Sequence, residues 1–242
     1  MKKSIVLTAI LCAIATVASA APITIGQWAG GGRTWNSVDF STIKATMEGA
    51  GHTMEADEAI TAANLANNAM FVIGEPGGAL TGAEATDLAN WLSGGGILWV
   101  GLDSFSTAAG ANALVAGLGG SMSVTSANGF YETPLSGGSF ASTGPPFNLV
   151  GSSLTTSLQL GPVAGGNVLA GNMVHWEAIG NGFLFLSSDR FEQNFSGSTA
   201  ATTNGQFLLN IANGPTAVAP EPATLGLMAI GLAGLVRRRF RR

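Results

Sequence analysis

Hydrophobic periodicity divides the centre of the chain into short apolar runs and amphipathic segments. Continuous apolar runs predict buried strands. Such runs occur at residues 23–28, 70–73 and 97–100. Apolar residues at helical spacing predict helices at residues 38–50, 81–93 and 108–118. Strand, helix and strand alternate within about thirty residues, so we expect βαβ units and a largely parallel sheet.

The helix at residues 81–93 has the most distinctive start. Thr81 and Glu84 form the S/T-x-x-E pattern of a capping box, and three consecutive glycines at residues 94–96 end the segment. Weaker signals predict a strand at residues 52–56 and a short helix at residues 61–67.

The pattern is poorer from residue 119 to residue 171, where Gly, Ser, Thr and Pro dominate. We expect an irregular, β-rich insertion there. Residues 173–179 and 183–186 flank a Gly180-Asn181-Gly182 turn and predict a hairpin. A closing helix is predicted at residues 206–212.

The core of the chain resembles the class I glutamine amidotransferase-like superfamily, in particular its non-catalytic or uncharacterised extracytoplasmic branches. The resemblance is carried by Leu80-Thr81, Glu84, Trp91-Leu92, Gly94-Gly95-Gly96-Ile97-Leu98 and the late strand at residues 180–189. It implies an α/β flavodoxin-like three-layer sandwich with a mostly parallel sheet. The domain would span residues 21–213.

The N-terminal residues are typical of a secretory signal peptide. Lys2 and Lys3 precede an apolar run at residues 5–17, and Ala18-Ser19-Ala20 gives the small residues that signal peptidase recognises. We expect export through the Sec translocon and cleavage between Ala20 and Ala21. The single cysteine, Cys12, lies in this segment, so the mature protein would lack disulfides and cysteine chemistry.

The C-terminal residues have three parts. A proline-rich linker at residues 214–222 precedes fourteen apolar residues at 223–236. An arginine cluster follows, made of Arg237, Arg238, Arg239, Arg241 and Arg242. A helix of this length is about 21 Å long, shorter than the ~30 Å hydrocarbon core. We therefore expect a marginal transmembrane helix whose arginines stay in the cytoplasm.

Pro220-Glu221-Pro222, followed by the apolar segment and the arginines, resembles the PEP-CTERM sorting signal. The resemblance implies processing by an exosortase, a transpeptidase-like membrane enzyme of Gram-negative bacteria that make exopolysaccharide. A plain tail anchor is the alternative.

Charge is distributed unevenly along the chain. Residues 21–219 contain thirteen acidic and three basic residues, a formal charge of −10. Nucleic-acid binding needs clustered cations, so this function is excluded for the body. The composition is compatible with a protein outside the cell.

Two groups of polar residues could form a site. Ser104, His175 and Glu177 could make a hydrolytic triad, since His175 and Glu177 alternate on one strand and would share a face. The alternative is ordinary polar residues on a strand, because the amidotransferase cysteine is missing and no G-x-S-x-G elbow is present.

Glu75, Asp103 and Asp189 form the second group, because each follows a predicted strand. The carboxyl ends of parallel strands are where ligands bind, and three carboxylates there could hold Ca²⁺ or Mg²⁺, with Arg33 near them. The alternative is that these acids cap helices and turns. Trp28, Trp35 and Trp176 could stack on sugars or simply belong to the core.

We therefore expect an exported surface or extracellular-matrix protein that is associated with exopolysaccharide in a biofilm and is not an enzyme. The alternative is an extracytoplasmic hydrolase, or a carbohydrate- or ligand-binding domain on an amidotransferase-like fold.

Overall fold

The computed structural model describes residues 21–31, 34–76, 80–103, 107–125, 135–140, 152–156, 162–171, 173–189 and 198–214, together with residues 147, 149 and 160. The first half of the described chain contains β1 (Thr24–Trp28), the 3₁₀ turn η1 (Val38–Phe40), α1 (Ser41–Gly49), β2 (Thr53–Glu58), α2 (Ala62–Leu65), β3 (Met70–Gly74), α3 (Gly82–Ser93), β4 (Ile97–Gly101) and α4 (Ala108–Gly117). The second half contains β5 (Ser123–Val124), β6 (Leu135–Phe140), β7 (Ser152–Thr156), β8 (Val163–Ala164), β9 (Asn167–Ala170), β10 (Val174–Ile179), β11 (Gly182–Ser187) and α5 (Ser198–Ala212).

A seven-stranded sheet forms the centre of the domain, with the strand order β2-β1-β3-β4-β11-β10-β9. The first five strands in this order pair in parallel. Strand β10 is antiparallel to its neighbour β11, and β9 is antiparallel to β10. The prediction of an α/β fold with a mostly parallel sheet is confirmed.

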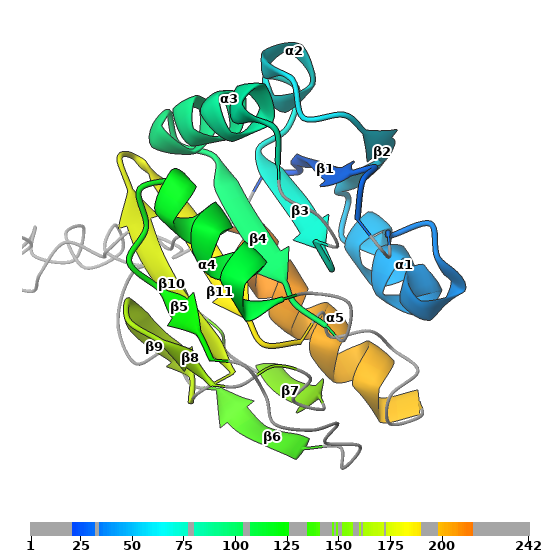
Figure 1. Cartoon of the computed structure of the whole chain (residues 1–242). Helices are drawn as coiled ribbons and strands as arrows, with labels where there is room; N and C mark the ends of the chain where they lie inside the picture. The colour runs from blue at the N-terminus through cyan, green and yellow to red at the C-terminus, as the bar shows by residue number, and fades with distance from the viewer. Residues whose placement is uncertain are drawn as a thin grey trace, which may run out of the picture.

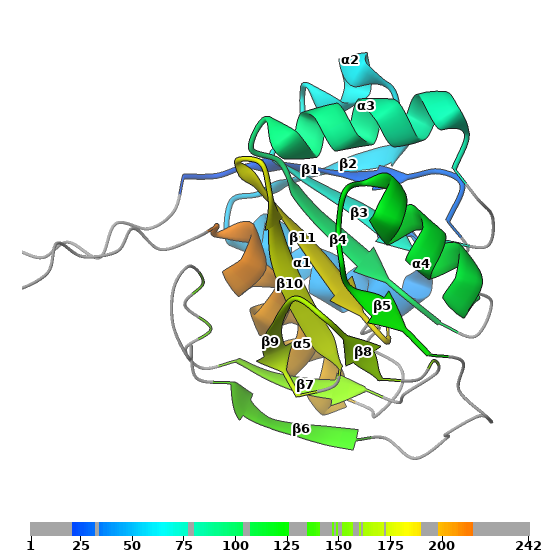
Figure 2. The ribbon, with the colours of Figure 1, turned by 60° about the vertical axis from the view of Figure 1, so that its left-hand side comes forward.

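Helices cover both faces of this sheet (Figures 1 and 2). On one face, α1 and α5 pack against Trp99 and Phe185. On the other, α2, α3 and α4 pack against Phe71, Leu98 and Leu184. Successive residues of a strand point to opposite faces, and because both faces are covered, every residue of β3 and β4 is buried.

Helix α3 starts as the sequence predicts. The Thr81 hydroxyl accepts a hydrogen bond from the Glu84 N–H at 3.2 Å, and the Thr81 N–H donates to Glu84 Oε2 at 2.9 Å. This reciprocal pair is the capping box. At the other end of the helix, the Trp91 ring lies so close to Gly96 that a Cβ there would be 2.4 Å from it. The glycine therefore allows β4 to start directly under the helix.

The β10–β11 hairpin is also confirmed, with Gly180 in the left-handed region at φ 61°. Its turn sits on the end of α3, where the Asn181 N–H donates to the Ser93 carbonyl at 2.9 Å. The last helix differs from the prediction, because α5 begins at Ser198 and not at residue 206. Gly205 lies within this helix and packs against Thr46 of α1, so close helix contact overrides the low helix propensity of glycine.

Candidate functional site

The parallel strands β1, β3, β4 and β11 all end at one edge of the sheet, which we call the carboxyl edge. Three of these strands end level with one another, because Gly74 of β3 pairs with Gly101 of β4, which in turn pairs with Ser187 of β11. In open α/β sheets ligands bind at this edge, above all where the strand order reverses. Here the reversal lies between β1 and β3, so this crevice is the first place to look for a site.

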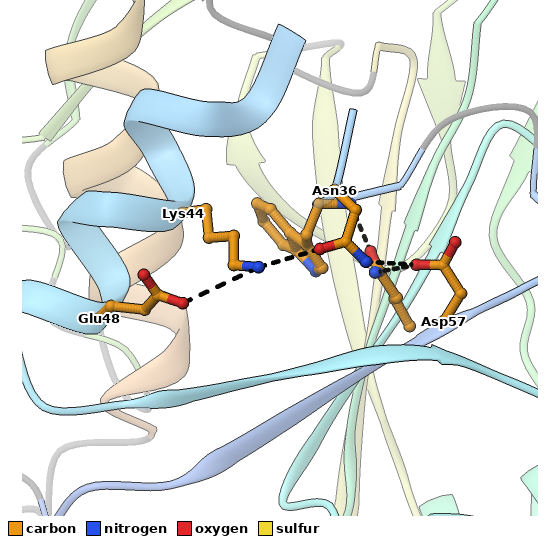
Figure 3. Close-up of polar contacts among 6 residues, drawn as sticks. Asn36, Lys44, Glu48 and Asp57 are labelled. Atoms are coloured by element: carbon orange, nitrogen blue, oxygen red, sulfur yellow. Dashed lines mark hydrogen bonds and ion pairs between the residues drawn. The ribbon is translucent and has the colours of Figure 1, made fainter. Parts of the chain in front are cut away.

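A polar network fixes the loop that follows β1 at this crevice (Figure 3). Asp57 of β2 accepts hydrogen bonds from the side-chain amides of Gln27 and Asn36, the latter at 2.9 Å. Lys44 of α1 donates to Asn36 Oδ1 at 2.9 Å and lies 3.9 Å from Glu48 Oε1. The network therefore ties the loop to both α1 and the edge strand. Its hydrogen-bonded partners are 8 to 30 residues apart, so no local sequence pattern could have found it.

Tryptophans fill the crevice that this loop borders. Trp28 is 9% exposed and Trp35 is 2% exposed. The Trp35 ring packs on Phe40 and Trp99, with centroids 5.4 and 6.2 Å apart, and the Trp35 backbone N–H donates to Gln27 Oε1. Trp28 and Trp35 are therefore core residues and do not form the sugar platform considered from the sequence. Trp176, the third candidate, is partly buried against Phe147.

The backbone also closes the crevice. Gly31 and Pro76 form a β-bridge across the point where the strand order reverses. Gly30 lies against the Trp28 ring, where a Cβ would be 2.5 Å from the nearest ring atom. The space that remains among Gln27, Trp28, Trp35 and their neighbours is about 10 Å³, enough for roughly one water molecule. A sugar or a nucleotide does not fit there.

The three strand-end acids lie along the carboxyl edge. Glu75, Asp103 and Asp189 follow β3, β4 and β11, which are adjacent in the sheet, and each is at most 2% exposed. Glu75 has a left-handed φ of 53°, and its N–H donates to the Gly101 carbonyl at 2.7 Å. A non-glycine residue in this region is strained and is held there by its surroundings.

These three carboxylates are not arranged as the cation site expected from the sequence. Among the described residues, no group of three His, Cys, Asp or Glu side chains is placed to hold a metal ion. The register gives a reason. Gly74 pairs with Gly101, so Glu75 is one residue beyond the last pair while Asp103 is two beyond it. Glu75 also leaves the extended backbone at φ 53°, so it is out of phase with Asp103, whereas Asp189, two residues beyond Ser187, shares the offset of Asp103.

His175 is used to hold a neighbouring hairpin. It is 5% exposed, and its Nδ1 and Nε2 lie 2.6 and 2.9 Å from the carbonyl oxygens of Gly165 and Gly171. Both oxygens belong to the β8–β9 segment, so the ring fastens that segment to β10. Within the described part of the chain, no hydrogen bond joins His175 to Glu177, and Ser104, the third member of the hypothetical triad, lies outside the described residues.

Glu177 is likewise occupied by backbone and hydroxyl donors. Its Oε1 accepts from the N–H groups of Ser121 and Met122 at 2.8 and 3.2 Å, and its Oε2 accepts from the Ser121 hydroxyl at 2.8 Å. Gly120 lies directly beside this carboxylate. Glu177 therefore caps the turn after α4, which is a structural role.

The residues expected to direct sorting lie outside the described residues, apart from Ala21. The sorting residues outside the described part of the chain are Ala18, Ala20, Pro220, Glu221, Pro222 and the arginines from Arg237 to Arg242. Among the described helices, none combines the length and the apolar character needed to cross a membrane.

Solved structures resemble the body in fold. The mmIFT52 N-terminal domain aligns with a TM-score of 0.58 at 16% identity, covering 81% of this chain and all of that domain. The exo-beta-1,4-mannosidase Op5Man5 from Opitutaceae bacterium strain TAV5 aligns with a TM-score of 0.44 at 13% identity, and the match covers 82% of this chain but 36% of that enzyme. At these identities the first match shows the fold alone, and the second is too distant to support any inference.

Sequence comparison adds information on the C-terminus. No curated protein matches the sequence significantly. Residues 218–242 match the PEP-CTERM protein-sorting motif. The match includes Pro220-Glu221-Pro222 and the arginine cluster, as the sequence analysis anticipated, and does not extend into the α/β domain. The chain therefore carries a PEP-CTERM protein-sorting motif at its C-terminus.

Proposed function

We propose that this protein is exported, anchored in the inner membrane through residues 223–236, and then processed by an exosortase for display at the cell surface. One observation carries the proposal, namely the PEP-CTERM match over residues 218–242. The order of its parts supports it, because a short apolar segment with terminal arginines is a marginal anchor and suits a temporary stop in the membrane.

The body acts at the surface without catalysis, as a matrix protein associated with exopolysaccharide. The filled crevice supports this part of the proposal. Trp28, Trp35 and the bridge between Gly31 and Pro76 occupy the place where enzymes of this architecture bind their substrates. His175 and Glu177 support it further, because their polar atoms already hold backbone groups. The strand order β2-β1-β3-β4-β11 agrees with a flavodoxin-like class for the body.

Replacement of Pro220, Glu221 and Pro222 by alanine tests the sorting step. In the native bacterium the variant should accumulate as a precursor that keeps its arginines and fractionates with the inner membrane. Intact-protein mass spectrometry of each fraction measures this. Pro215→Ala is the matched control, because it removes a linker proline outside the motif and should be processed normally. Equal masses and equal fractionation of the triple variant and the wild type would contradict the proposal.

An extracytoplasmic hydrolase or carbohydrate-binding domain is the second candidate. It is favoured by the buried acids Glu75, Asp103 and Asp189 and by the strained backbone of Glu75. Two assays on the mature protein test it: thermal unfolding with and without millimolar Ca²⁺ or purified exopolysaccharide, and release of reducing sugar from that exopolysaccharide. A ligand that binds only the folded state raises the unfolding midpoint. If neither ligand raises the midpoint and no sugar is released, the second candidate fails.

A further inference from the structure

The described chain begins and ends at the same edge of the sheet, opposite the carboxyl edge. We call it the amino edge, because the parallel strands start there. The Ile23 N–H, just before β1, donates to His52 Nδ1 at 3.2 Å, and Pro22 lies against Gly51. Asn213, just after α5, lies beside the same His52 side chain. Figure 2 shows the start of β1 and the end of α5 on the same side of the molecule.

The amino edge is formed by short segments without formal charge. These segments are residues 21–23, 50–52, 66–69, 94–96, 180–181 and 213–214. They consist of Gly, Asn, Ala, Pro and Ile together with His52, and none of them contains Asp, Glu, Lys or Arg. Glu48 in the last turn of α1 is ion-paired with Lys44. The segments at this end are therefore uncharged, although the body as a whole is acidic and Glu55 and Glu177 lie two residues inside β2 and β10.

The carboxyl edge has the opposite character. Glu75, Asp103 and Asp189 follow its strands, and Asp39 and Glu84 lie where α1 and α3 begin. Arg33 and Arg190, which lie outside the described residues, follow β1 and β11 in the sequence, so these residues together keep an excess of acids. Tight packing at the amino edge explains the glycines there but not the absence of charge, because exposed positions such as Asn67 and Asn181 could carry a carboxylate without a steric cost. The two edges thus differ in electrostatics as well as in shape.

We propose that the amino edge is the surface that this domain turns toward the lipid headgroups of the inner membrane while the precursor is anchored. The inference rests on the proposed membrane-anchored precursor. Between Gly214 and the apolar segment lie eight residues, 215–222. At about 3.1 Å per residue a proline-rich linker of this length reaches about 25 Å, so the amino edge stays close to the bilayer.

Electrostatics then selects the orientation. Anionic phospholipids give the membrane surface a negative potential that decays over roughly 8 Å at physiological salt. The neutral amino edge can approach this surface without repulsion, whereas the acidic carboxyl edge cannot. The acids Glu75, Asp103 and Asp189 would consequently face the periplasm, and the exosortase would reach Pro220-Glu221-Pro222 beside the neutral edge.

Site-directed fluorescence quenching tests the orientation on the full chain. The precursor is purified from a strain without exosortase, with Cys12→Ser, and reconstituted into vesicles of phosphatidylethanolamine and phosphatidylglycerol that contain headgroup-nitroxide lipid. One variant carries a fluorophore at Asn67→Cys, an exposed amino-edge position. The matched control carries it at Ala109→Cys, an exposed position near the carboxyl edge. The two edges are separated by the length of a five-residue strand, roughly 17 Å, so we expect quenching about threefold stronger at residue 67.

Flotation of the same vesicles tests membrane anchoring separately from the orientation of the domain. If the protein does not float with the lipid, the anchored precursor itself is disproved. If it floats but both labels are quenched equally, or residue 109 more strongly, the orientation is overturned. Vesicles without phosphatidylglycerol give a second test, since the ratio of quenching at the two positions should fall toward one. A ratio that is independent of lipid charge would overturn the electrostatic argument.

Discussion

In the parallel half of the molecule, from β1 to α4, the central strands β3 and β4 are buried at every residue. In the antiparallel flank, from β5 to β10, β5 and β8 have only two residues each, and β9 exposes two of its four. The parallel half is held by continuous apolar packing on both faces. The flank depends on individual side chains that reach across to backbone groups, such as His175 and Glu177.

The two buried histidines show the same difference. In the parallel half, His52 Nδ1 accepts a hydrogen bond from the Ile23 N–H, which only the neutral ring can do. In the flank, both ring nitrogens of His175 face carbonyl oxygens, so at least one of them donates. One histidine therefore joins two elements of a layered core, whereas the other substitutes for packing that the flank lacks.

The largest effect is expected where the two regions meet. Gly182 starts β11, and a Cβ there would be 2.0 Å from the Leu92 carbonyl oxygen and 2.4 Å from that of Gly96. Backbone atoms cannot move aside as a side chain can. Gly182→Ala should therefore lower the free energy of unfolding by about 3 kcal/mol or more, a fall of roughly 6–12 °C in Tm for a domain of this size. Differential scanning calorimetry measures it.

Gly117→Ala is the matched control for this substitution. Gly117 is the last residue of α4, and a Cβ built there meets nothing within 4 Å. Alanine is the better helix former, so this change should be neutral or slightly stabilising. A Gly182→Ala protein that unfolds at the wild-type temperature would show that the interface between the two regions can shift, contrary to our account.

The contrast also explains what the sequence could predict. The capping box of Thr81 and Glu84 and the glycines after α3 are local signals, and the parallel pairing follows from βαβ units. Apart from the turn of the β10–β11 hairpin, the flank has no comparable signal. Its strands β5 and β8 have two residues each, and the contacts that fix the flank join residues such as Glu177 and Ser121, which are 56 positions apart.

The candidate site was predictable only in part. Runs of apolar residues ending in an acid placed Glu75, Asp103 and Asp189 on one edge, because strand ends are visible in a sequence. Whether the side chains converge depends on register at the level of one residue, which periodicity does not fix. The sequence also left open whether Trp28 and Trp35 fill the crevice, because a tryptophan near a strand end is compatible with both a core position and a sugar-binding site.

The next effect should be confined to the flank. His175→Phe keeps a ring of similar shape but removes both hydrogen-bonding nitrogens, leaving the Gly165 and Gly171 carbonyls without these partners. A buried polar group left unsatisfied costs about 1–3 kcal/mol. We expect faster amide hydrogen exchange in β8 and β9, with unchanged protection in β3 and β4. His175→Gln, which retains one donor group, should recover part of the protection. Equal acceleration in both regions would mean that the flank is not an independent unit.

A smaller effect is expected at the start of α3. Thr81→Ala removes the capping hydroxyl and should cost about 1 kcal/mol. Hydrogen bonds to Glu84 Oε2 from the Thr81 N–H and from the Thr81 hydroxyl lower the pKa of Glu84, and Thr81→Ala removes the second of these bonds. The stability due to this carboxylate is therefore present above its unfolded pKa, about 4.3, and is lost as the pH falls through the folded value. Urea unfolding at several pH values should show that the Thr81→Ala deficit shrinks below pH 4. A deficit that stays constant with pH would indicate that the carboxylate plays no part in the cap.

The smallest effect concerns His52, at the junction of the two chain ends. Burial lowers the pKa of His52 from 6.5, and the neighbouring Asn213 side chain offsets part of this. The folded state thus resists protonation, so the contribution of the neutral ring is complete above 6.5 and is lost as the pH falls below that value toward the folded pKa. The wild type should lose more stability between pH 8 and pH 5 than His52→Asn, whose amide oxygen can still accept the Ile23 N–H.

Only the pH dependence of this difference is diagnostic. The shorter asparagine leaves a cavity, but this lowers the free energy of unfolding by the same amount at every pH. His175 is present in both proteins and cancels in the comparison. Urea unfolding of the wild type and of His52→Asn at matched ionic strength gives the two curves. If they run parallel from pH 8 to pH 5, His52 does not couple the chain ends to pH. If the two curves converge at low pH, protonation of His52 destabilises the junction of the two chain ends. Both sorting segments leave the domain from this junction.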